Sequence, residues 1–195
     1  MSAAETTDPG AGAAATAAAR EALVVPATAG ESPATEACPG CGAVLVVVPG
    51  LISHHAGASP SCSGLFDVTV RGLRDDAAAD VRTAGILQVA TDAYEAQHLP
   101  PGRPPAAAAR LCLWVARGLN PVRPPEHTDR LADALPRTLP APDRWTTTVA
   151  DVAADLDVVD LPSLVRSWAE AVWADWAGAH EELCAAVDAA QAVPS

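Results

Sequence analysis

Apolar residues three or four positions apart dominate the chain beyond residue 60 and predict a mostly helical protein. The clearest pattern follows Asp160, which suits an N-cap position and stands two residues before Pro162. The apolar stripe of this last helix comprises Leu161, Leu164, Val165, Trp168, Val172, Trp176, Leu183 and Val187. Four more helices are expected over residues 64–73, 77–98, 106–119 and 128–135.

The first third of the chain has a different pattern. Residues 1–34 are rich in Ala, Thr and Pro and have few large apolar side chains, which predicts a disordered tail. Residues 35–63 are rich in cysteine and turn formers, and the apolar run at 43–48 predicts one short strand. The sequence therefore predicts a mainly α protein with a single helical domain over residues 35–192. We expect a small helical bundle with a zinc-knuckle-like N-terminal lobe at 35–63.

Charge and composition narrow the range of partners. The chain has 195 residues and a formal net charge of −12, with 24 acidic side chains against 12 basic ones, all of them arginine. Such a surface repels phosphate, which argues against nucleic acid and against anionic membranes as partners. A protein partner of unknown identity remains open.

The cysteine count bears on the compartment. No apolar run approaches the roughly 20 residues of a membrane span, and the acidic N-terminus does not resemble a signal peptide. Five cysteines is an odd number, which argues against a disulfide framework. We therefore expect a cytoplasmic protein with reduced thiols, in which Cys112 and Cys184 are small core residues.

The strongest chemical signal is the Cys38-Pro39-Gly40-Cys41 turn. Two cysteines separated by a Pro-Gly pair can direct both sulfurs at one metal ion, as in a zinc knuckle. Redox sites use the same spacing, but their cysteines usually open a helix. Here a strand-like segment follows, which favours zinc.

A tetrahedral zinc site needs two further ligands, and the sequence offers two sources. Local ligands would be Cys62 with His54 or His55, which would close a structural site of three cysteines and one histidine. In the alternative, both histidines are solvated in a loop.

Remote ligands would be His98 and His180, each on the apolar face of a predicted helix. If both reached Cys38 and Cys41, the site would contain two cysteines and two histidines and would hold the lobe against the bundle. In the alternative, they are hydrogen-bonded core histidines.

Several motifs together resemble an uncharacterised bacterial family, domain of unknown function 5946, over about residues 37–190. They are Cys38-Pro-Gly-Cys41-Gly42, Gly57-Ala-Ser-Pro60-x-Cys62, Asp92-Ala-Tyr94-x-x-Gln97-His98 and Trp168-Ala-Glu170-x-Val172-Trp173-x-x-Trp176 with His180. Ser63 departs from the tryptophan expected there, and no aromatic residue stands near His55 in the sequence. The resemblance implies no known activity, but it implies a shared metal site that includes one or both remote histidines.

These features lead to an expected function and two alternatives. We expect a zinc-binding helical protein whose zinc is structural and which acts by binding. A metal-dependent enzyme, either a hydrolase or a thiol or group-transfer enzyme, would need an open zinc position, with Glu95 or Asp92 as base. A regulatory protein-interaction module is the third class. The number of protein ligands on the metal distinguishes the first two.

Overall fold

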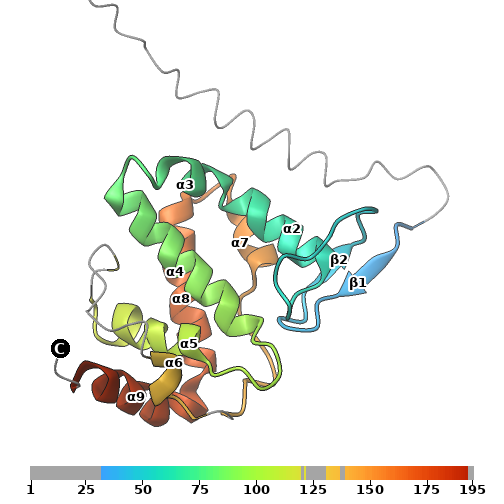
Figure 1. Ribbon diagram of the computed structural model, residues 1–195. Helices are drawn as coiled ribbons and strands as arrows, with labels where there is room; N and C mark the ends of the chain where they lie inside the picture. Colours follow the sequence, from blue (N-terminus) through green and yellow to red (C-terminus); the bar gives the residue numbers. More distant parts are fainter. Residues whose placement is uncertain (1–31, 120, 122–130, 137–138, 193–195) are drawn as a thin grey trace, which may run out of the picture.

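The computed structural model describes residues 32–119, 121, 131–136 and 139–192. It confirms a mainly α protein with a small two-stranded sheet near the N-terminus (Figure 1). The predicted tail at residues 1–34 lies outside the described residues except for its last three. Among the described helices, none is long and apolar enough to cross a membrane.

The N-terminal lobe is a short antiparallel hairpin. Strand β1 (Thr35–Ala37) pairs with β2 (Val44–Val46), with Glu36 opposite Leu45. The strand predicted at 43–48 is thus present in shortened form. Its partner β1 was not predicted, because Thr-Glu-Ala is too short to show an alternating pattern.

Three helices follow the lobe. They are α2 (Pro60–Thr69), α3 (Arg71–Asp76) and α4 (Val81–Gln97). Helix α2 begins before the predicted start at 64, because the Ser59 side chain caps it and Pro60 occupies the first turn. Helix α4 begins after the predicted start at 77, because Asp80 accepts hydrogen bonds from the first backbone N–H groups of the helix. Helix α4 lies at the centre of the bundle, packed against α5 and α8 (Figure 1).

The next segment is more broken than predicted. Helix α5 (Ala106–Leu111) continues as one π-helical segment, η1 (Cys112–Ala116), and a short α6 (Leu131–Ala134) follows. Part of the helix expected at 128–135 lies outside the described residues. Helix α7 (Val149–Asp155) starts at a capping box and packs against α2.

The prediction of one long last helix is wrong. The chain forms α8 (Leu161–Asp175), a 3-10 turn η3 (Ala177–Ala179) and α9 (His180–Ala192). The break follows Trp176, and α9 then packs against α5 and α6. The apolar stripe continues across the break because both helices bury one face in the same core, so periodicity alone does not reveal it.

The expectation of two separate core cysteines is also wrong. Cys112 of η1 and Cys184 of α9 form a disulfide across 72 residues, with Cα atoms 6.0 Å apart. The odd cysteine count therefore reflects one bridge and three free cysteines. This bridge fixes α9 against the segment that follows α5.

An aromatic cluster fills the core between the lobe and the bundle. Phe66 of α2 stacks on Tyr94 of α4 with ring centroids 4.1 Å apart, and Trp168 of α8 meets both edge-on. The Trp168 indole donates to the side chain of Gln97, whose amide donates to the carbonyl of Thr147. These contacts fix the C-terminal end of α4, where His98 lies.

Candidate metal centre

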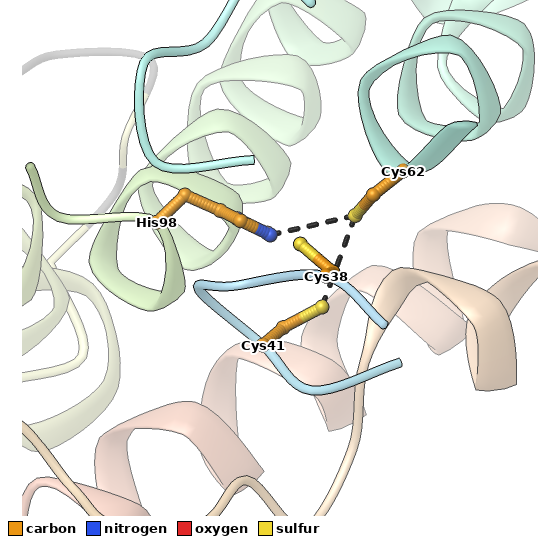
Figure 2. Close-up of side chains that lie close together, drawn as sticks. All are labelled: Cys38, Cys41, Cys62 and His98. Carbon is orange, nitrogen blue, oxygen red and sulfur yellow. Dashed lines mark hydrogen bonds between the residues drawn. The ribbon is translucent and has the colours of Figure 1, made fainter. Parts of the chain in front are cut away.

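The first two cysteines lie in the turn between β1 and β2. The N–H of Cys38 donates to the carbonyl of Ala43 at 2.8 Å, and the N–H of Gly42 donates to the carbonyl of Cys38 at 2.9 Å. Gly42 has a φ of 76°, a left-handed conformation that glycine adopts without strain. The turn brings the sulfurs of Cys38 and Cys41 toward one point (Figure 2).

The third cysteine is supplied by the first turn of α2. Cys62 is three residues beyond the N-cap Ser59, whose hydroxyl accepts from the Cys62 N–H at 3.3 Å. The N–H of Ser59 in turn points at the sulfur of Cys38 at 3.4 Å. The start of α2 therefore places both the Cys62 sulfur and the Ser59 N–H beside the knuckle.

The fourth member is His98, the C-cap residue of α4. Its Nδ1 donates to the carbonyl of Tyr94 at 2.7 Å, which leaves Nε2 facing Cys62 at 3.4 Å from its sulfur (Figure 2). The Tyr94 hydroxyl also donates to the Cys62 sulfur, at 3.6 Å. One ring nitrogen of His98 is thus held by backbone, while the other is directed into the cluster.

The four side chains form a compact and buried group. The ligand atoms of Cys38, Cys41, Cys62 and His98 all lie within 4.8 Å of one another. The residues are between 0% and 5% exposed. Three sulfurs and one imidazole nitrogen at this spacing can hold one metal ion.

Close packing of the thiols shifts their proton affinities in opposite directions. Hydrogen bonds from Cys41 and then Cys62 lower the pKa of Cys38, whereas hydrogen bonding to Cys38 and Cys41 and burial raise the pKa of Cys62. Burial lowers the pKa of His98, but hydrogen bonds to Cys38 and Cys41 outweigh it and raise that pKa to about 9. These directions favour a Cys38 thiolate beside a protonated His98, so a metal ion that binds here has to displace protons from the cluster.

Gly40 of the knuckle and Gly57 of the loop before α2 both lie close to the C-terminal end of α4. A Cβ at Gly40 would lie 2.6 Å from Cδ2 of His98, and one at Gly57 would collide with the carbonyl of His98. The Trp145 indole donates to the carbonyl of Gly40 at 2.9 Å. No sequence pattern indicates this contact, because the two residues are 105 positions apart.

His54, His55 and His180 lie outside the four-residue cluster. His55 meets the Tyr94 ring edge-on at 4.8 Å, and burial lowers its pKa. His180 stacks on Trp173 with centroids 3.8 Å apart, and its Nε2 lies 2.7 Å from the carbonyl of Trp173. The structure thus brings Cys62 and His98 to the knuckle, and it does not bring His55 or His180 there.

The fold and the site define a class: a helical protein in which a cysteine knuckle is joined to the bundle through a buried group of three cysteines and one histidine. The chain belongs to the family described as "Family of unknown function (DUF5946)", which matches residues 36–177. The match includes all four residues of the cluster. No curated protein and no solved structure matches the chain.

Proposed function

We propose that the cluster binds one zinc ion as a structural site. Zinc with tetrahedral geometry, at about 2.3 Å from sulfur and about 2.0–2.1 Å from nitrogen, needs S···S distances of about 3.8 Å and S···N distances of about 3.6 Å. The sulfurs of Cys41 and Cys62 are 3.8 Å apart, and the Cys62 sulfur is 3.4 Å from His98 Nε2. These two pairs match the spacing around zinc, and all four ligand atoms lie within 4.8 Å of one another; this spacing is the observation that carries the proposal.

The donor set also favours zinc over hard cations. Thiolate and imidazole ligands suit zinc, whereas calcium and magnesium take oxygen ligands. Hydrogen bonds from the Ser59 N–H and the Tyr94 hydroxyl support the thiolates, as is usual around bound metals. Because four buried protein ligands complete a tetrahedron, no coordination position is left for a substrate. The zinc therefore stabilises the fold, and the protein acts through binding.

The first experiment is elemental mass spectrometry on protein purified without a histidine tag. We expect one zinc per chain, and its loss in Cys41→Ser and Cys62→Ser. Cys184→Ser is the matched control, because it removes a sulfur outside the cluster and should leave the zinc content unchanged. Unchanged zinc in both cluster variants would contradict the proposal.

X-ray absorption at the zinc edge tests the structural role separately. Three sulfurs and one nitrogen are expected around the ion. A shell with only three protein ligands and a water oxygen would favour the alternative of a metal-dependent enzyme.

We also propose that the protein works in the cytoplasm, where cysteine ligands remain reduced. The Cys112–Cys184 disulfide argues against a cytoplasmic location, because such bonds persist in oxidising compartments. Thiol alkylation in denaturing lysate decides between the two. Five reactive thiols would agree with the cytoplasm, and three would place the protein in an oxidising compartment.

A further inference from the structure

A cavity of about 280 Å³ lies beside the cluster and shares His98 with it. This volume is near the lower end of the range for pockets that bind small molecules. The rest of the wall includes leucine, proline and alanine. Its titratable residues are His54, His55, Glu95, His98, Arg103 and Arg110.

Arg110 is held firmly in the wall of this cavity. Its Nε donates to Oδ1 of Asp92 at 2.6 Å, and its Nη2 donates to Glu95 at 3.1 Å. Asp92 is fully buried and also accepts from the Trp114 indole at 2.7 Å. Both carboxylates are thus engaged by Arg110 and are not free to act as bases. Among the described residues, Nη1 of Arg110 has no partner, so a rigidly held donor remains for a ligand.

Arg103 supplies a second cation to the same cavity. It is exposed and forms no ion pair with any described residue, although the chain carries 24 acidic side chains against 12 basic ones. The only carboxylate in the wall belongs to Glu95, which Arg110 already engages. The cavity therefore offers the Arg103 guanidinium and the remaining N–H groups of Arg110 beside a wall of mixed polar and apolar residues, an arrangement that can recognise an organic anion.

We propose that this cavity binds a small organic molecule through an anionic oxygen group, a carboxylate or a phosphate. Arg103 and Arg110 hold the anion, and the carbon skeleton lies against the wall of proline, leucine and alanine. The inference rests on the binding function proposed above, since it names the class of ligand. It does not depend on the metal, because neither arginine belongs to the cluster.

The test uses the full chain and three probes of similar shape: benzoate, phenyl phosphate and the neutral benzamide. Binding is followed by chemical-shift changes in amide NMR spectra. At least one anion should bind about tenfold more tightly than benzamide, and the tighter anion identifies the group recognised. Arg103→Gln should weaken that binding by about fivefold or more. The control Arg71→Gln, an exposed arginine on α3 at the other end of α4 (Figure 1), should leave it unchanged.

Equal affinity for benzamide and the anions would overturn the proposal. Equal effects of the two arginine variants, or no saturable binding of either anion in the millimolar range, would overturn it as well. Zinc content is measured on the same samples. Zinc-loaded protein without anion binding refutes only the cavity, whereas zinc-free protein that binds the anion refutes only the metal site.

Discussion

Replacing Gly40 by alanine tests whether the close contact between the knuckle and α4 holds the site together. The new Cβ would lie 2.6 Å from the Gly57 carbonyl oxygen, 2.6 Å from Cδ2 of His98 and 2.8 Å from the Gln97 carbonyl oxygen. The two shortest approaches fall about 0.8 Å below an ordinary contact of 3.4 Å. Two of the three obstacles are backbone atoms, so the lobe has to move away from the end of α4.

The size of the effect follows from this overlap. Overpacking in a filled interior costs about 1–3 kcal/mol, and rigid obstacles place Gly40→Ala near the upper end, at about 3 kcal/mol. For a domain of this size, that lowers Tm by about 6–12 °C. The same displacement moves His98 away from the cysteines, so we expect zinc affinity to fall by about tenfold or more.

The assay combines denaturant unfolding with competition for zinc against a chromophoric chelator. Gly72→Ala is the matched control, because a Cβ there meets nothing within 4 Å. In helix α3 this change should raise the free energy of unfolding by about 0.5–1 kcal/mol and leave zinc affinity unchanged. If Gly40→Ala unfolds at the wild-type denaturant concentration or keeps the wild-type zinc affinity, the contact does not position the site.

Three further predictions concern other parts of the molecule. His180→Ala should lower the free energy of unfolding by about 1–3 kcal/mol, because the stacking on Trp173 and the hydrogen bond to its carbonyl are lost. Zinc content should not change, and a reduced zinc content would indicate that His180 is a metal ligand. Asp92→Ala should cost about 3–5 kcal/mol in urea unfolding because it leaves Arg110 without its buried partner, whereas Glu95→Gln at the half-exposed partner should cost less than about 1 kcal/mol. Zinc affinity should fall as pH falls. Burial lowers the pKa of His98, but hydrogen bonds to the cluster cysteines outweigh it and raise that pKa to about 9, so protons compete with zinc for this ligand below that pH. Chelator competition between pH 6 and 9 measures this slope, and a flat profile would contradict it.

The parts of the site that depend on local chain geometry could be predicted from the sequence. The Cys38–Cys41 spacing indicates a shared metal ion because a Pro-Gly turn fixes both sulfurs within a few residues. Cys62 follows a Ser-Pro helix start, which is also a local signal. The choice between His98 and His180 could not be made, because it depends on the break between α8 and α9. That break directs the face of His180 toward Trp173.

Contacts between residues far apart in the sequence could not be predicted either, because they depend on how the helices pack. The partners Cys112 and Cys184 are 72 residues apart on helices whose periodicity indicates burial only. The indole of Trp145 binds the Gly40 carbonyl from a loop with no regular pattern. Apolar periodicity predicts which face of a helix is buried, and it does not identify the side chain that the face meets.

The order of the four cluster residues along the chain has a consequence for synthesis on the ribosome. Cys62 and His98 are 36 residues apart, and chains grow at about 5–20 residues per second. The three cysteines therefore emerge about 2–7 s before the histidine. Under the proposed function, a zinc ion taken up by the nascent chain in that interval would have only three protein ligands and would still be exchangeable. Under the proposed function, the metal would be enclosed only when α4 is complete, so the step that traps it would be the docking of the C-terminal end of α4 on the lobe.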